Sequence, residues 1–521
     1  MDPTFYQFQL SLLAIICIAL IAFERYLTSK RAPPDHFKDT VIEDSIEVGH
    51  PVLQTNGAPV PTSTSSRAGA LKTLMRKYLL VYAIVMGADW LQGPYVYSLY
   101  REQYGFPERL VAVLFVTGFM SAAIFAPLVG VWADTNSYLF LRLSGRKRIC
   151  LLFCILYATT CGLLLFPFFP LLLLARILGG ISTSILFSGF ESWLVSSSSN
   201  AALQSEDLSS IMGRATLVNG FVATAAGVFS NQLVGWNNGG FRSPFVASGC
   251  LLLLAWVVIS GSWSENYGGG AGAGTAQISV DIFQIRRLGA AWRIVAADPV
   301  LLVLGLTQTI FEGSMYLFVF IWVPTLQESS LDPTFLPLGY IFSAFMVSMM
   351  FGSLLYTYIT AHWYPPAPSS SLQKHTRSAS VGTLPTQGDS SLVLHAQLSA
   401  LVCAASSVTF AACVSIGKGK GDEMEHLKFW AFCLFEACVG MYYPVQGMLR
   451  GSLIANEHRA TLSSLFRVPL NVFVVVSLMT GVSSARDAVL TTCAIVLAIS
   501  SLTTTFVVIP RVEAPVQSRT A

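Results

Sequence analysis

The sequence predicts an all-α polytopic membrane protein with two six-helix bundles and one extra N-terminal transmembrane helix. Of the 521 residues, 53% are hydrophobic and 11% are charged, about half the charged fraction of a typical soluble protein. Apolar stretches of about 20 residues, each long enough to cross ~30 Å of hydrocarbon, recur along the whole chain. A Gly-rich and then basic stretch at 264–297 divides the last twelve of them into two sets of six.

The first apolar stretch, residues 5–23, is expected to be a transmembrane anchor within residues 1–24. No basic residue precedes it and no small-residue cleavage pattern follows it, so it does not resemble a signal peptide. Basic residues then recur from Arg25 to Lys77 and place the loop at 25–74 in the cytoplasm by the positive-inside rule.

The remaining elements follow in two sets. An N-terminal six-helix bundle is expected at 75–263, with spans near 75–99, 109–133, 149–168, 171–195, 210–235 and 243–263. The linker at 264–297 contains Arg286, Arg287 and Arg293 and should cross on the cytoplasmic side. A C-terminal bundle is expected at 298–510, with spans near 298–325, 336–358, 392–415, 427–449, 461–482 and 487–510, before a cytoplasmic tail at 511–521. Within this bundle, the Pro- and Ser-rich loop at 359–391 is predicted to be disordered.

Composition argues against several function classes. The net charge is only +3 and the basic residues lie in short clusters between apolar segments, so no nucleic-acid partner is expected. The ten cysteines fall almost entirely inside apolar segments without metal-ligand spacing, which predicts buried hydrophobes and neither a metal site nor a cofactor. Neither an H-E-x-x-H nor a G-x-S-x-G motif occurs, so the chain is not expected to be an enzyme.

Two six-helix halves around a basic linker are typical of transporters that bind substrate near the midplane and rock around it. A charge at the bilayer centre costs ~3 kcal/mol, so it usually faces a cavity or a partner. Asp89 and Glu312 each lie fourteen residues into the first span of their half. They are therefore predicted to be repeat mates that face each other across the pseudo-twofold axis.

The fifth spans of the two halves also correspond. Arg214 lies five residues before Asn219, and Arg467 lies four before Asn471. These coincidences predict an internal duplication, although both arginines could equally be gate or interface residues.

Three further charges lie inside the predicted spans: Arg176 and Glu191 on the fourth, and Glu436 on the tenth. Arg176 and Glu191 could simply pair to hold helices together, and this alternative stays open beside a functional role.

Two motifs suggest a family. GVWAD, with Gly130 and Asp134, precedes GRKR, with Gly145, Arg146 and Lys147. Together they resemble the loop between the second and third core helices of the major facilitator superfamily, which implies a cytoplasmic latch. Ten residues separate Asp134 from Gly145 where the family usually has two. RILGG, with Arg176 and Gly180, resembles the Arg-x-x-x-Gly pattern that the family associates with proton coupling or helix packing.

A more specific resemblance runs from about residue 87 to 475. ADWLQGPYVYSLY, GRKRICLLFCILY, ARILGGISTSILFSGFESW, ENYG, TQTIFEGSMYLFVFIWVPTL and FRVPLN together resemble the eukaryotic molybdate-anion transporters. The resemblance implies a major facilitator fold and a secondary active transporter for high-affinity uptake of molybdate, the precursor of molybdenum cofactor. It favours a multi-pass protein of the cell membrane.

Molybdate is a tetrahedral dianion, which arginine and neutral hydrogen-bond donors suit. The candidate substrate-binding or gating residues are Arg176, Arg214, Arg467, Asn219, Asn471, Gln92 and Gln308. The carboxylates would repel the ligand while ionised, so Asp89, Glu312, Glu436 and Glu191 are candidates for coupling to protons. Two alternatives remain at this stage: a major facilitator carrier of another anion or small solute, and a membrane receptor or scaffold that does not transport.

Overall fold

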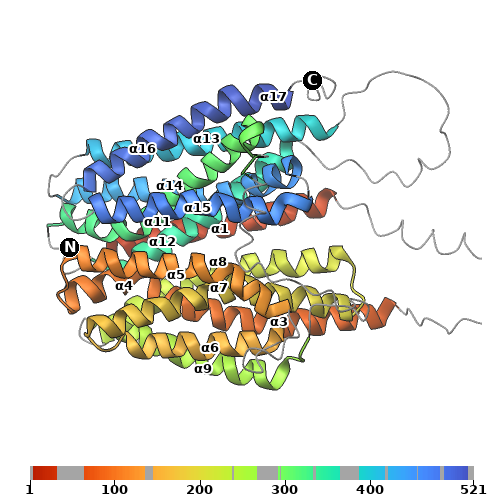
Figure 1. Cartoon of the computed structure of the whole chain (residues 1–521), viewed down its shortest axis with the longest axis horizontal. Helices are drawn as coiled ribbons and strands as arrows, with labels where there is room; N and C mark the ends of the chain where they lie inside the picture. The colour runs from red at the N-terminus through yellow and green to blue at the C-terminus, as the bar shows by residue number, and fades with distance from the viewer. Residues whose placement is uncertain are drawn as a thin grey trace, which may run out of the picture.

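The computed structural model contains helices and no strand in the residues it describes, which are 4–31, 64–134, 145–236, 240–266, 292–293, 295–331, 336–363, 387–416, 421–454, 456–481 and 486–513. The long helices form two layers that lie side by side along their length (Figure 1). Apolar side chains such as Phe187 and Phe506, 70% and 73% exposed, cover the outer surface, as expected for helices that face lipid.

One layer is the N-terminal half. It contains α3 (Thr64–Gln92), α5 (Glu108–Asp134), α6 (Arg146–Leu163), α7 (Phe169–Asn200), α8 (Ser205–Trp236) and α9 (Ser243–Ser262). Three short turns, η1 (Gly93–Tyr95), α4 (Val96–Ser98) and η2 (Leu99–Gln103), extend α3 towards α5.

The other layer is the C-terminal half. It contains α11 (Pro299–Ser329), α12 (Leu338–Trp363), α13 (Gln387–Ser415), α14 (Asp422–Leu453), α15 (Asn456–Gly481) and α16 (Arg486–Thr503). The last span is completed by η4 (Thr504–Val508) and α17 (Ile509–Glu513).

Within the described residues, nine helices are long and apolar enough to cross a membrane. The other long helices, α3, α6, α14 and α15, are more polar and carry the candidate residues Asp89, Glu436 and Arg467. The prediction of an all-α polytopic membrane protein is confirmed.

Several helices extend beyond the predicted spans. α3 begins at Thr64 instead of near 75, because a helix that leaves the hydrocarbon can continue with polar residues in water. The prediction of a disordered loop at 359–391 is wrong at both edges, because α12 continues to Trp363 and α13 begins at Gln387. Its centre, 364–386, and most of the linker, 267–291, lie outside the described residues.

The extra helix α1 (Thr4–Arg31) packs on the outside of the C-terminal half, against α12 and α14. The Tyr6 hydroxyl donates a hydrogen bond to Glu425, and the Phe5 ring stacks on His426 with centroids 3.6 Å apart. Most of its apolar side chains remain exposed, including Phe8 and Ile15 at 65%. α1 therefore lies at the periphery of the bundle.

One pair of helices in each half packs with almost no space between the backbones. On α7, a Cβ added at Gly180 would lie 2.6 Å from the Gly118 carbonyl oxygen of α5. On α14, a Cβ added at Gly440 would overlap the Met349 carbonyl of α12, and one at Gly352 would overlap the Ala437 carbonyl. Small residues permit this close approach, which gives membrane helices their van der Waals contact.

The halves meet along α8 with α12 and along α5 with α15. At the first contact, the Ser343 hydroxyl donates to the Thr224 carbonyl at 2.8 Å. At the end of the molecule where α4 lies, on the left of Figure 1, Arg486 of α16 reaches across to Glu108 of α5. The charge pattern predicts that this end faces outside, and it is called the outer end below.

Candidate substrate-binding site

In the N-terminal half, the intramembrane acid has a partner inside its own bundle. Asp89 on α3 accepts a hydrogen bond of 2.6 Å from the Tyr157 hydroxyl on α6. The next residue, Trp90, points differently: its indole nitrogen donates to the Asn219 side chain at 2.8 Å, and its ring lies 5.9 Å from the Phe342 ring of the other half. Trp90, not Asp89, is thus the α3 residue seen in contact with the opposite half.

Gln92 joins two helices of the N-terminal half. Its amide nitrogen donates to the Ser248 hydroxyl on α9 at 2.9 Å, and the side chain is 5% exposed. This bond ties α3 to α9, away from the opposite half.

Arg176 on α7 lies among aromatic rings with no acid beside it. Its guanidinium carbon is 5.1 Å from the centroid of the Phe115 ring, and its Nε donates to the Leu114 carbonyl at 3.3 Å. Among the described residues, no carboxylate oxygen lies within 4 Å of it. Glu191 is exposed and fifteen residues further along the same helix, about 22 Å away at 1.5 Å per residue, so the two do not pair.

In the C-terminal half, acid and base belong to one network. Glu312 on α11 accepts hydrogen bonds of 3.4 Å from the Gln308 amide and from the Tyr442 hydroxyl on α14. Arg450 on α14 donates to the other end of the Gln308 amide at 3.2 Å. Gln308 therefore bridges a carboxylate and a guanidinium that do not touch each other.

Sequence reasoning missed Arg450 because the apolar pattern ended the tenth span at residue 449, whereas α14 continues to Leu453. Arg450 could have been found by allowing the tenth helix to continue past the end of its apolar stretch. The prediction that Asp89 and Glu312 face each other is not supported, because each makes its polar contacts within its own half.

The arginines of the fifth spans are both exposed side chains. Arg214 on α8 points to the Met75 sulfur at 3.1 Å. Asn471 donates to the Arg467 carbonyl one turn earlier on α15 at 2.8 Å, whereas Asn219 accepts from Trp90. The two asparagines therefore have different partners, despite their matching positions in the sequence.

The close helix contacts reveal a correspondence that the sequence did not. Gly180 on α7 meets the Gly118 carbonyl of α5, and Gly440 on α14 meets the Met349 carbonyl of α12. Arg176 lies four residues before Gly180, and Glu436 lies four residues before Gly440. Arg176 and Glu436 thus occupy matching positions in the two halves, with opposite charges.

Glu436 is 6% exposed and lies two turns before Tyr443 on α14. Within the part of the chain that the structure describes, its carboxylate makes no ion pair.

The expected latch residues Gly145, Arg146 and Lys147 contact the end of α9. The Lys147 backbone nitrogen donates to Glu265 at 2.9 Å, and its Nζ donates to the Trp263 carbonyl at 2.7 Å. Gly145 has φ +124°, which favours glycine, and a Cβ there would lie 2.6 Å from Glu265. Gly130 and Asp134 lie in the last turns of α5, and their surroundings are outside the described residues.

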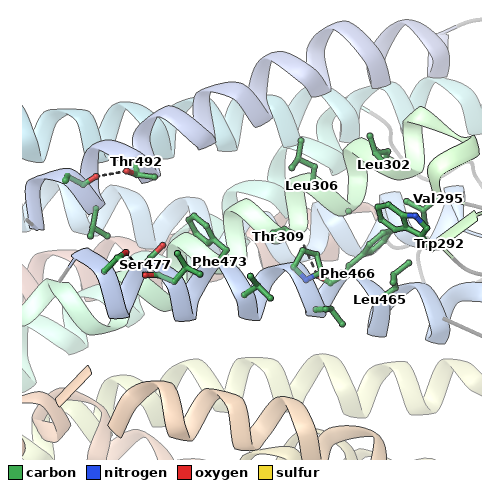
Figure 2. Close-up of a pocket in the computed structure, with 18 residues that line it drawn as sticks. Trp292, Val295, Leu302, Leu306, Thr309, Leu465, Phe466, Phe473, Ser477 and Thr492 are labelled. Carbon is green, nitrogen blue, oxygen red and sulfur yellow. Dashed lines mark hydrogen bonds between the residues drawn. The ribbon is translucent and has the colours of Figure 1, made fainter. Parts of the chain in front are cut away.

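A separate apolar groove of about 1090 Å³ lies between α11, α15 and α16 (Figure 2). Leu306, Phe466 and Phe473 point into it, and none of its lining residues is charged. The groove offers a dianion no cation, and none of the candidate residues lines it.

Comparisons with known proteins agree on a transporter fold. A family profile described as sugar transporters with 12 transmembrane segments matches residues 55–367. The molybdate-anion transporter of Takifugu rubripes is 30% identical over 436 residues, which cover 80% of this chain and 82% of that protein. That of Xenopus tropicalis is 33% identical over 427 residues, covering 81% and 82%.

Solved structures share the fold. The nucleoside transporter NupG matches with a TM-score of 0.57 and 12% identity, over 83% of this chain and 99% of that chain. An auto-inhibited peptide transporter of the POT family matches with a TM-score of 0.58 and 13% identity, over 85% and 98%. At such low identity these likenesses concern the fold alone.

Proposed function

The chain belongs to the molybdate-anion transporter family of the major facilitator superfamily, and from this premise we propose that it carries molybdate across a membrane by alternating access. It is an integral, multi-pass membrane protein and not an enzyme. The plasma membrane is the location we propose, because uptake from outside the cell requires it.

The observation that carries the choice of substrate class is an arginine inside the bundle without an acidic partner. In the described residues, no carboxylate oxygen lies within 4 Å of Arg176. Arg450 is linked to Glu312 through Gln308, and Arg467 is exposed, so neither is in the same position. An uncompensated guanidinium inside a bilayer is costly, which favours an anion that arrives from outside the protein to meet Arg176. A tetrahedral oxyanion suits the guanidinium fork, which can donate two parallel hydrogen bonds.

The outer end supplies a gate for alternating access. Arg486 donates to both oxygens of Glu108, at 3.1 and 2.9 Å, and its third nitrogen lies 2.5 Å from Glu328. Gln327 of the C-terminal half also donates to Glu102 of the N-terminal half at 2.8 Å. These contacts join the halves where substrate would enter from outside, so outward opening requires that they break.

Proton coupling is the second part of the proposal. Asp89, Glu312 and Glu436 are acids inside the bundle, and an ionised carboxylate repels a dianion strongly at low dielectric. Protonation of these acids during loading would remove that repulsion. Glu191 does not join them, because its side chain is exposed.

The test is uptake of radiolabelled molybdate by purified protein in sealed liposomes, with and without a pH gradient. We expect saturable uptake that tungstate inhibits more than sulfate does, and that uridine or a dipeptide leaves unchanged. Replacement of the exposed Arg101 by Gln is the matched control, because it removes an arginine from the surface and should not change uptake.

The protein must retain its thermal unfolding transition for the assay to count. If such protein gives no more uptake than protein-free liposomes, molybdate transport is rejected. Equal uptake at all pH gradients would reject the coupling alone.

A further inference from the structure

We infer that Arg176 and Tyr100 form the oxyanion subsite of the N-terminal half, in which the guanidinium and the phenolic hydroxyl both donate to one tetrahedral anion. This inference rests on the proposed function and assigns it a pair of residues. Tyr100 was not a candidate in the sequence, where it looked like an interfacial aromatic residue near the end of a span.

The first observation is a buried hydroxyl without an acceptor. Tyr100 on η2 is fully buried, and no acceptor for its hydroxyl proton is seen among the described residues. The group beside the hydroxyl is the Arg176 guanidinium, which can only donate. Leaving such a group unsatisfied costs about 1–3 kcal/mol. Buried polar groups in native proteins usually have a partner, and an anion that accepts from this hydroxyl would supply one.

The second observation is the arginine beside it. The Arg176 guanidinium carbon lies 5.9 Å from the centroid of the Tyr100 ring and 5.1 Å from that of Phe115. Its Nε donates to the Leu114 carbonyl at 3.3 Å. Among the described residues, the terminal nitrogens have no acceptor besides the neighbouring Tyr100 hydroxyl, so they remain able to donate to an oxyanion, which accepts parallel hydrogen bonds from a guanidinium.

The third observation is how the guanidinium is held. The guanidinium packs against α5 at Gly118, where a Cβ would be in ordinary van der Waals contact with it, 3.4 Å from Nε and 3.6 Å from one terminal nitrogen. Aromatic rings and a backbone carbonyl fix the group without neutralising its charge. An arginine inside a membrane that only held helices together would be expected to pair with an acid.

The other arginines are less well arranged. Arg214 and Arg467 are exposed to a greater degree than Arg176, which is half-buried. Arg450 already donates to Gln308 and to the Gln446 carbonyl. Arg176 and Tyr100 are the pair in the described residues that combines a cation without an acid and a buried donor without an acceptor.

The experiment measures binding and stability on the same purified protein. Sodium molybdate, tungstate, sulfate and phosphate are titrated into detergent-solubilised protein, and the thermal unfolding midpoint is recorded without anion. We expect Tyr100→Phe to weaken binding about tenfold, as loss of a hydrogen bond to a charged group does, while the midpoint stays equal or rises. Binding should thus weaken without any loss of stability, which a structural role would not produce.

Arg176→Lys keeps the charge but loses the fork, and should weaken binding about tenfold; Arg176→Gln should weaken it about a hundredfold or more. Tyr104→Phe is the matched control. The Tyr104 hydroxyl has partners, since it donates to the Leu164 carbonyl at 2.6 Å and accepts from Arg242 at 3.3 Å. Its loss should lower the unfolding midpoint and leave binding unchanged.

The outcomes separate this inference from the proposed function. If the wild type transports molybdate and Tyr100→Phe binds it equally well, the subsite is wrong and the transporter proposal stands. If the wild type binds sulfate or phosphate but not molybdate, and Tyr100→Phe weakens that binding, the subsite stands and the choice of molybdate is wrong. If no oxyanion binds the wild type, both are wrong.

Discussion

In the N-terminal half, Arg176 lies one turn before the glycine at which α7 touches α5, whereas in the C-terminal half Glu436 lies one turn before the glycine at which α14 touches α12. The contacts match because close packing of two backbones admits only a glycine at the crossing. The residue one turn earlier is not restricted by that contact. The two halves have therefore kept the same packing and differ in the charge beside it.

The acids show the same contrast. Asp89 accepts from the Tyr157 hydroxyl and makes no ion pair among the described residues, while Glu312 belongs to a network with Gln308, Tyr442 and, through Gln308, Arg450. The C-terminal half thus links its acid to an arginine through a hydrogen-bonded amide, and no such amide bridge is seen in the described residues of the N-terminal half. From this difference we expect the N-terminal half to bind the anion, and the acids of the C-terminal half to change their protonation as the anion binds.

The largest effect on stability should come from changes at the glycines where two helices of one half touch, a contact that both halves share. Gly440→Ala should disrupt folding more than Gly180→Ala, because the new Cβ overlaps the Met349 carbonyl, whereas at position 180 it lies 2.6 Å from its nearest backbone atom. Overpacking typically costs about 1–3 kcal/mol or more. Size-exclusion profiles and unfolding midpoints measure the order, with Gly162→Ala as the control because nothing lies within 4 Å of its Cβ position. Equal midpoints for the three variants would contradict the packing argument.

The next effect should come from the charges that differ. Arg176→Glu should abolish molybdate uptake, because it replaces the proposed anion donor with a repelling carboxylate. Glu436→Gln should keep uptake within about threefold at neutral pH, since a neutral polar group of the same shape remains. The exchange Arg176→Glu with Glu436→Arg sharpens the comparison: restored uptake would mean that the two positions are interchangeable and that the proposed division of roles is wrong.

A smaller effect is expected at the acids. Glu312→Gln should tighten molybdate binding, because it removes a negative charge beside the Gln308 and Arg450 network. The expected gain in affinity is about three- to tenfold, the size of one partly screened interaction between two charges. Asp89→Asn should leave the dissociation constant within about twofold, because Asn can still accept from Tyr157. Both variants should change the pH dependence of uptake. Unshifted pH profiles in both would make these acids structural.

The smallest effect should come from the cytoplasmic end of the N-terminal half. Glu265 accepts from the Lys147 backbone at 2.9 Å and lies 3.8 Å from Arg148 at the start of α6. Glu265→Gln should cost up to about 1 kcal/mol of stability, typical for a carboxylate at a helix N-terminus. Uptake should not change, because these contacts lie within one half. A large fall in the uptake rate would instead assign the cluster to gating.

The sequence by itself determined the fold class, an all-α polytopic membrane protein, and which charges lie inside its apolar segments. Apolar stretches of about 20 residues are a local property, and so is an acid such as Asp89 or Glu312 inside one of them. The correspondence of Arg214 with Arg467 as repeat positions stays a prediction from the sequence, since it depends only on the local spacing to the following asparagine.

Only the tertiary structure decided which side chains meet. Tyr157 is 68 residues from Asp89, and Arg450 is 142 residues from Gln308, so no local pattern relates them. The match between Arg176 and Glu436 depends on where two pairs of helices cross, and that register is set by the glycines that let the backbones touch. A hydropathy pattern reports which residues prefer lipid, but not how helices are rotated against each other; that rotation comes from packing between distant segments.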